Sequence, residues 1–258
     1  MALRRATFPT GNQFLDNMPE AAKQALGPLL EHTALHNGRI LYEIDQHISE
    51  VFFPLASVLS VVLDMADGKT AEVGIIGCEG MSGLPLALGQ SSSNQRTVVQ
   101  VSDSAHCMPA DVFCGVLECE PQLRAFSMRY AQATIMACTQ LAACNGLHSL
   151  DERCARWLLM AHDRVAGDVV LLTQEFLGQM LGVRRAGVTL AASALQRAGF
   201  ISYTRGHISV KNRGGLEAAA CECYGAVQRN WETLMGYPIG RKKLNGAYPG
   251  NGEAQDSA

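Results

Sequence analysis

Several features are missing from this 258-residue sequence, and each absence excludes a class of protein. No apolar run approaches the roughly 18 to 20 residues that cross a bilayer. No apolar segment follows the two arginines near the N-terminus, so we expect neither a membrane span nor a secretory signal. None of the nine cysteines forms a Cys-x-x-Cys pair, which disfavours zinc and iron–sulfur sites. We therefore expect buried, reduced cysteines in a cytoplasmic protein without a bound metal.

The patterns of common catalytic sites are also missing. A cupin-like metal site needs converging histidines, typically a His-x-His on a strand, and none occurs among the seven histidines. No Ser/His/Asp or Cys/His arrangement has a catalytic spacing, and no glycine-rich phosphate loop follows a strand. The sequence predicts a protein that is not an enzyme, with a cupin-like metal-binding enzyme as a less favoured alternative.

Prolines are missing between Pro121 and Pro238. Because proline breaks helix interiors, we expect strands and turns in the first half and helices in the second. Short β-branched or aromatic runs predict strands, and Asp67-Gly68 predicts a type I′ hairpin turn, which needs positive φ. This pattern favours an antiparallel barrel or roll. The predicted strands are Ile40–Ile44, Val51–Phe53, Val58–Met65, Lys69–Ile76, Thr97–Val101 and Ala105–Met108.

From Pro121 to Leu150, apolar residues recur at helical spacing on two faces. A helix with two apolar stripes needs two partners, which we expect to be its own barrel and the same helix of a second chain. A single helix buried inside one domain is the alternative. The first stripe is Leu123, Phe126, Tyr130, Ala133, Ala137, Gln140, Cys144 and Leu147, and the second is Met128, Ile135, Cys138 and Ala142.

Acidic residues are missing from Arg184 to Arg213, a segment that holds six basic residues. The net charge of −3 hides this division, because residues 1–150 sum to −6 and residues 151–213 to +4. A solvated surface normally mixes both signs. A basic segment without any carboxylate is typical of a surface that meets phosphates.

The same region has the spacing of a helix-turn-helix. Thr173 can cap a helix that ends at Leu181, Gly182 makes the turn, and a second helix follows from about Arg184 to Ala198. A helix from Asp151 to Val165 and a short strand, Val169–Leu172, precede the motif. Two short strands around Arg205-Gly206, within Phe200–Val210, follow it and predict a wing.

In this order, the β-roll, the long helix and the winged helix-turn-helix resemble the cyclic-AMP receptor protein/FNR (Crp/Fnr) family of transcription regulators. The resemblance runs from about Leu29 to Leu216, with Val51–Leu55 and Gly77–Pro85 also similar, and is most specific at Ser149–Leu159 and Leu172–Arg185. It implies an α+β fold with an antiparallel β-roll of the cyclic-nucleotide-binding-like, jelly-roll type. It also implies a homodimer on an inverted repeat of double-stranded DNA, with RNA polymerase as a further candidate partner.

The expected organisation has five parts. They are an N-terminal arm (1–28), the β-roll (29–120), a dimerisation helix (121–150), the DNA-binding domain (151–216), and a C-terminal helix with a disordered tail after Tyr237 (217–258).

The resemblance also places the DNA contacts. Arg185 matches the arginine that contacts a guanine, and Ala186 stands where a base-reading glutamate is frequent, so we expect a different base preference. Gly187 costs the helix about 1 kcal/mol relative to alanine, without a reason visible in the sequence. The predicted DNA-binding residues are Thr173, Gln174, Arg184, Arg185, Ala186, Thr189, Arg205, Lys211 and Arg213.

The sequence does not determine which small-molecule effector, if any, binds in the β-roll. Relative to nucleotide-binding members of the family, a methionine, Met81, replaces the glutamate that holds the ribose, and Arg96 is the one arginine between Arg39 and Arg124. A buried cyclic phosphate needs a cation, so a cyclic-nucleotide-gated regulator is the disfavoured alternative. The first cysteine, Cys78, lies too late for an N-terminal iron–sulfur cluster. Haem bound through His32, His36 or His47 has no supporting pattern, so we expect no cofactor. The candidate pocket residues are Met81, Ser82, Arg96, Thr97 and Gln140.

Overall fold

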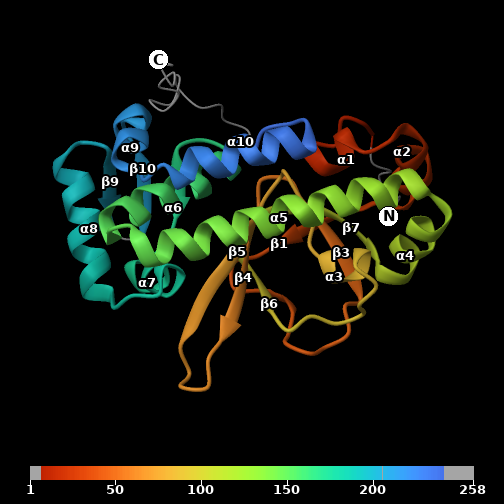
Figure 1. The fold of residues 1–258 in the computed structure, drawn as a ribbon, viewed down its shortest axis with the longest axis horizontal. Coiled ribbons are helices and arrows are strands. Elements are labelled where there is room, and N and C mark those ends of the chain that lie inside the picture. Colours follow the sequence, from red (N-terminus) through yellow and green to blue (C-terminus); the bar gives the residue numbers. More distant parts are fainter. Residues whose placement is uncertain (1–6, 205, 241–258) are drawn as a thin grey trace, which may run out of the picture.

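The computed structural model describes residues 7–204 and 206–240. Figure 1 shows a β-roll below the long helix α5 (Pro121–Leu147), and at the C-terminal end of that helix lies the domain that the sequence predicts to bind DNA, called the DNA-binding domain below. The α+β fold class expected from the sequence is confirmed. None of the helices in the described ranges is both long and apolar enough to cross a membrane.

The β-roll consists of two antiparallel sheets. The first has the order β1-β7-β3, and the second has the order β2-β6-β4-β5. All six predicted strands are present, but β1 was missed because four of its five residues face solvent or are only half-buried, so no apolar alternation marks it. The strands are β1 (Glu31–Leu35), β2 (Ile40–Tyr42), β3 (Glu50–Pro54), β4 (Val58–Asp64), β5 (Thr70–Ile76), β6 (Arg96–Val101) and β7 (Asp103–Pro109).

The predicted hairpin between β4 and β5 is confirmed, but its turn is not of type I′. Gly68 has a φ of 80°, whereas Asp67 is not among the described residues with positive φ. The Gly68 amide donates to the Met65 carbonyl, and the Met65 amide donates to the Lys69 carbonyl. Positive φ is therefore needed only at the glycine.

Helices cover the roll from the side of α5. The N-terminal arm is part of this core, because Phe14 on α1 (Gln13–Asn17) is fully buried and its ring contacts those of Phe126 and Tyr130 on α5. The remaining elements here are α2 (Glu20–Leu26), the 3₁₀ turn η1 (Gly27–Leu29), α3 (Leu84–Ala87) and α4 (Ala110–Cys119).

The two stripes of α5 have different surroundings. The first is buried at Leu123, Phe126, Tyr130 and Ala133. Of the second, Met128 and Ile135 are exposed by 40% and 60%, respectively. Leu147, which was expected on the buried stripe, is 81% exposed because the helix ends there.

The DNA-binding domain has its own core, built around α6 (Leu150–Arg164). A capping box between Ser149 and Glu152 fixes the start of α6. The other elements are β8 (Val169–Leu171), α7 (Gln174–Leu181), α8 (Arg185–Arg197), β9 (Ile201–Thr204), β10 (His207–Val210) and α9 (Arg213–Ala219).

The chain then returns toward the roll through α10 (Cys223–Met235), which lies alongside α5 (Figure 1). Trp231 packs edge-on against Tyr130, which belongs to α5. The disordered tail was expected after Tyr237, but Ile239 is buried and Gly240 accepts a hydrogen bond from Gln13. The predicted tail beyond residue 240 lies outside the described residues.

Candidate nucleic-acid interface

The predicted helix-turn-helix is confirmed at both ends of its first helix. The Thr173 hydroxyl caps α7 by accepting a hydrogen bond from the Phe176 amide at 3.2 Å. Gly182 ends the helix in the left-handed region, with a φ of 65°. The helix therefore begins and ends at the residues that the turn chemistry predicts.

Glycine also sets how closely the helices of this domain approach one another. A Cβ on Gly178 would lie 3.0 Å from the Val183 carbonyl oxygen, so this position must stay small for the chain to turn into α8. A Cβ on Gly187 would lie 2.9 Å from Leu150 Cδ2 on α6. Leu150 Cδ2 is the end of a flexible side chain, so this contact disfavours a larger residue at position 187 only to the extent that Leu150 is held in place.

The wing is present as a three-stranded sheet in the order β8-β10-β9. It is tied to the motif because the Leu172 amide donates to the Gly206 carbonyl at 2.7 Å. Arg205, which we predicted to contact DNA, lies outside the described residues.

The start of α8 presents the predicted base-reading residues to solvent. Arg184 is the N-cap of α8 and Arg185 and Ala186 form its first turn, and all three residues are exposed. Their side chains are therefore available to a partner outside the protein.

Gln174 and Thr189 link the two helices of the motif. The Thr189 hydroxyl lies 2.8 Å from Gln174 Oε1 and 3.0 Å from the Arg185 carbonyl. These contacts hold the polar groups of α7 and α8 on a common face. Both residues are half-buried rather than free side chains.

Thr173 occupies a less open position than the sequence predicts. Thr173 is exposed, but it lies on the wall of a cleft between the DNA-binding domain and the β-roll. Asn37, Gln100 and Ser102 form the opposite wall. In this arrangement of the domains, Thr173 faces the roll.

The internal ion pairs of Arg213 do not support its predicted role as a DNA contact. Its guanidinium lies 2.7 Å from the fully buried Asp163 carboxylate and 2.6 Å from the Tyr224 hydroxyl, and it also pairs with Glu217 at 2.9 Å. Only 12% of the Arg213 side chain is exposed. The prediction failed because a buried carboxylate needs a cation, and this arginine supplies it. Lys211, in contrast, is exposed.

Buried charges on α6 connect the DNA-binding domain to the roll. Arg164 pairs with Glu79 at 2.8 Å, and both side chains are at most 4% exposed. The Trp157 indole donates to Glu72 on β5 at 2.7 Å. Burial raises the pKa of Glu72 to about 7, although hydrogen bonds from Ser60 and Trp157 act in the opposite direction. Sequence reasoning missed this interface, because the helical pattern of α6 does not show which residues of the roll its side chains meet.

The predicted effector residues do not gather around one cavity. A cavity of about 110 Å³ lies between the second sheet, α5 and α10, and of the five predicted residues only Thr97 lines it. Met81 and Ser82 are buried, and the Ser82 hydroxyl is bound to that of Tyr42 at 2.6 Å.

Arg96 and Gln140 also lie away from this cavity. Arg96 pairs with Asp64 at 2.9 Å, and Gln140 contacts Cys223. Among the described residues that line the cavity, the one arginine is Arg164, which Glu79 already neutralises. The cavity therefore lacks the free cation that a cyclic phosphate would need.

The cysteines were expected to be buried, reduced and free of metal, but three of them lie together beside a histidine. All nine carry free thiols, and Cys119 is exposed rather than buried. Cys144, Cys221 and Cys223 meet His148 in one cluster that sequence reasoning missed. The spacings Cys-x-x-x-His and Cys-x-Cys were the available signal, but they lie more than 70 residues apart in the chain.

Comparisons with known proteins agree with this geometry. Residues 152–219 match the family model of the Crp-like helix-turn-helix domain. No curated protein matches the chain.

Solved structures with the same fold include FixK2 from Bradyrhizobium japonicum, at 16% identity and a TM-score of 0.64, covering 74% of this chain and 98% of that one. A second is a Crp/Fnr family regulator, described as putative, from Eubacterium rectale, at 16% identity and a TM-score of 0.62, covering 79% and 95%. A third is a CRP family regulator from Thermus thermophilus, at 15% identity and a TM-score of 0.58, covering 80% and 98%. These likenesses show the fold of 74–80% of this chain.

Two findings bear on the family. The matched domain is the one whose turn, helix crossing and wing are described above. The roll, the long helix and the DNA-binding domain follow in the order seen in those structures. Residues 152–219 thus form a Crp-like helix-turn-helix domain, and the chain shares the fold of solved structures that include CRP family and Crp/Fnr family regulators.

Proposed function

We propose that the chain binds an inverted-repeat operator as a homodimer and places the start of α8 in the major groove of each half-site. The observation that carries this proposal is the exposed first turn of α8, where Arg184 and Arg185 project with no acidic residue anywhere between Arg184 and Arg213. Arginine reads guanine through two parallel hydrogen bonds in the major groove.

The electrostatics of the interface come from a smaller set of residues than the sequence indicates. Arg213 is neutralised internally by Asp163, so it does not contribute to the DNA-facing surface. Arg184, Arg185 and Lys211 remain exposed. In the proposal, Arg185 reads a base and Lys211 contacts a backbone phosphate. Ala186 has no hydrogen-bonding group, so the next base pair is read weakly or by another residue.

The dimer is supported by the second stripe of α5. Met128 and Ile135 lie on a face of α5 that the described chain leaves largely uncovered, while the core and α10 cover other faces of the helix. A second copy of the same helix would cover this face, as in a coiled coil. Two recognition helices would then lie about 34 Å apart, one turn of DNA.

The test is the selection of bound sequences from a random duplex pool with the full chain. We expect an inverted repeat with two chains per duplex. Arg185→Ala should then cost about 1–3 kcal/mol at one base pair of each half-site and relax the preference there. The matched control, Lys211→Ala, should weaken binding to every sequence alike and reduce the salt dependence by about one phosphate contact. An equal loss on all sequences for Arg185→Ala would overturn its assignment as a base reader.

The other partners and the location follow from this proposal. A regulator of transcription works beside the chromosome, which places this chain in the cytoplasm, and RNA polymerase is its further candidate partner. Co-purification of RNA polymerase on operator DNA, with and without the chain, tests the latter.

A further inference from the structure

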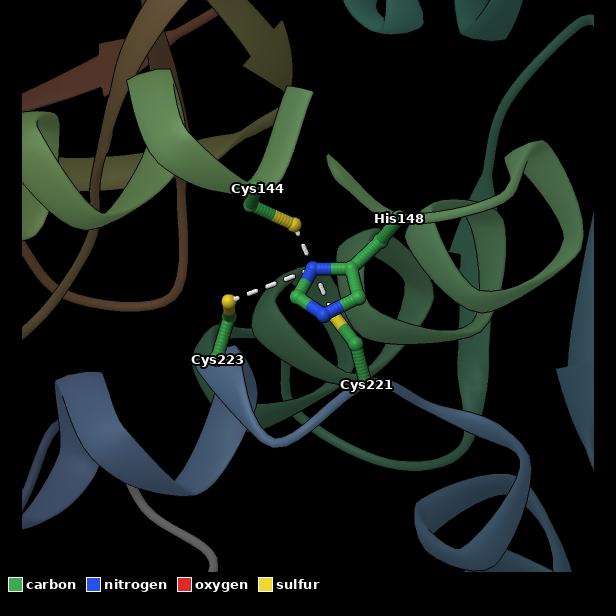
Figure 2. Close-up of side chains that lie close together, drawn as sticks. All are labelled: Cys144, His148, Cys221 and Cys223. Atoms are coloured by element: carbon green, nitrogen blue, oxygen red, sulfur yellow. Dashed lines mark hydrogen bonds between the residues drawn. The ribbon is translucent and has the colours of Figure 1, made fainter. Parts of the chain in front are cut away.

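Three thiols and one imidazole converge where the dimerisation helix ends. Cys144 lies in the last turn of α5, and His148 is its C-cap. Cys221 and Cys223 come from the junction between α9 and α10. Figure 2 shows the four side chains pointing toward a common centre, and their ligand atoms all lie within 4.8 Å of one another.

The separations fit a tetrahedral zinc site. With Zn–S bonds of about 2.3 Å and a Zn–N bond of about 2.0–2.1 Å, a tetrahedron has edges of about 3.8 Å between sulfurs and about 3.6 Å between sulfur and nitrogen. Here the Sγ atoms of Cys144 and Cys221 are 3.4 Å apart, and Cys223 Sγ lies 3.6 Å from His148 Nδ1. The four groups need only small movements to surround one ion.

The surroundings of the cluster orient its members as in a metal site. The Nε2 atom of His148 lies 3.2 Å from the Glu222 carboxylate, which leaves Nδ1 directed at the sulfurs. Metal-bound histidines usually donate their other ring N–H to such a carboxylate. The Gln140 side-chain amide donates to Cys223 Sγ at 3.0 Å, a contact that suits a thiolate.

The local charge also fits a zinc–thiolate group. Three thiolates, one neutral imidazole and Zn²⁺ carry a net charge of −1. Arg156 is 3% exposed and interacts electrostatically with Cys144. None of the ion pairs among the described residues involves Arg156, and its Nε atom is buried without a hydrogen-bond partner. Arg156 also interacts electrostatically with the buried Glu72, and an anionic metal centre would add to the compensation of this buried cation.

We propose that Cys144, His148, Cys221 and Cys223 bind one structural Zn²⁺ ion. The ligand set is soft, closed and of the Cys₃His type, which selects zinc over hard cations. Binding releases the three thiol protons to solvent as three Zn–S bonds form, and no oxidant or reductant is needed. The ion would fasten the α9–α10 junction to the end of α5, next to the point where α6 and the DNA-binding domain begin.

The first experiment uses the full chain, purified under reducing conditions with zinc present and then dialysed. Elemental analysis should find about one zinc per chain. Substitution with Co²⁺ should give the absorption of a tetrahedral, thiolate-bound ion. Zinc should protect Cys144, Cys221 and Cys223 from alkylation, with protection lost on adding a chelator, while the exposed Cys119 reacts in both states.

Variants separate the ligands from their neighbours. Cys223→Ser should lose stoichiometric zinc, and the matched control Cys119→Ser should keep it. His148→Cys should retain the metal through a fourth thiolate. Glu222→Gln should weaken zinc binding by about 10–100-fold, as is typical when the partner of a metal-bound histidine is removed.

The proposal is overturned by three results. The first is a wild-type chain that retains no zinc, and the second is an octahedral cobalt spectrum. The third is an iron–sulfur chromophore, or a Cys144–Cys221 disulfide in reducing buffer, in place of zinc. Because the metal content and alkylation pattern are measured without DNA, failure here leaves the proposed operator binding unaffected.

Discussion

Replacing Arg213 with methionine should destabilise the fold while the DNA contacts of α8 stay in place. The Asp163 carboxylate is fully buried and accepts hydrogen bonds from Arg213 at 2.7 Å, Tyr224 at 2.8 Å and Gln228 at 2.8 Å. Removing the arginine leaves a buried charge with neutral donors alone. Breaking such a pair costs about 3–5 kcal/mol. At about 2–4 °C per kcal/mol, the melting temperature should fall by about 6–20 °C.

The loss should depend on pH in a defined direction. Burial raises the pKa of Asp163 to about 6, although the charge of Arg213 acts in the opposite direction. Without Arg213 this pKa rises further. Because the folded-state pKa lies above the unfolded one, the stability that protonation contributes is fully present at low pH and is lost as pH rises through the folded-state pKa. The deficit of the variant should therefore be largest at a pH above the further raised pKa of its Asp163, shrink as the pH falls toward about 6, and stay constant below that value.

Thermal unfolding followed by circular dichroism at several pH values measures this deficit, with operator affinity measured well below the melting temperature. Adding Asp163→Asn should restore much of the stability, because no buried charge then remains. A variant with wild-type stability but a salt dependence of DNA binding reduced by about one contact would refute this reasoning and show that Arg213 reaches a phosphate.

The remaining predictions concern the roll and the dimer. Burial raises the pKa of Glu72 from its ordinary value of 4.5 to about 7. The stability that its protonation contributes is therefore fully present below pH 4.5 and is lost as the pH rises through about 7. Glu72→Gln should flatten the pH dependence of unfolding in urea between these values, and unchanged slopes would contradict this. Ile135→Glu should give monomers in sedimentation and lose affinity for the inverted repeat, unlike the control Gln122→Glu at the exposed helix start. A stable dimer of Ile135→Glu would show that this face is not the interface.

The parts of the fold that the sequence predicted are those fixed by short-range chemistry. Thr173 and Gly182 define α7 because an N-cap and a left-handed glycine act within one turn of a helix. The buried stripe of α5 was readable because its apolar residues repeat at helical spacing, whereas the dimer expected on the second stripe stays a prediction. In contrast, the polar strand β1 has no alternation to mark it, and its pairing with β7 is a contact between segments distant in the chain.

What could not be predicted depends on partners distant in the chain. Arg213 is basic in a basic segment, and only the position of Asp163, 50 residues earlier, shows that its charge is used internally. Cys144 and Cys221 are separated by 77 residues, so their approach depends on how α10 packs. The approach of Gly187 to Leu150 on α6 is likewise visible only in the folded chain. In each case a tertiary contact decided what the local pattern left open.

Helix α10 restrains how the two halves of this molecule can move relative to each other. Tyr224, in its first turn, belongs to the core of the DNA-binding domain, whereas Trp231 and Met235 belong to the core of the roll. The two halves of the molecule are therefore joined twice, once through α6 and once through this returning segment. Two connections limit rotation of the DNA-binding domain relative to the roll more than one connection would. A fragment cut at residue 219 would lose the second attachment and leave apolar surface on α5 without its cover.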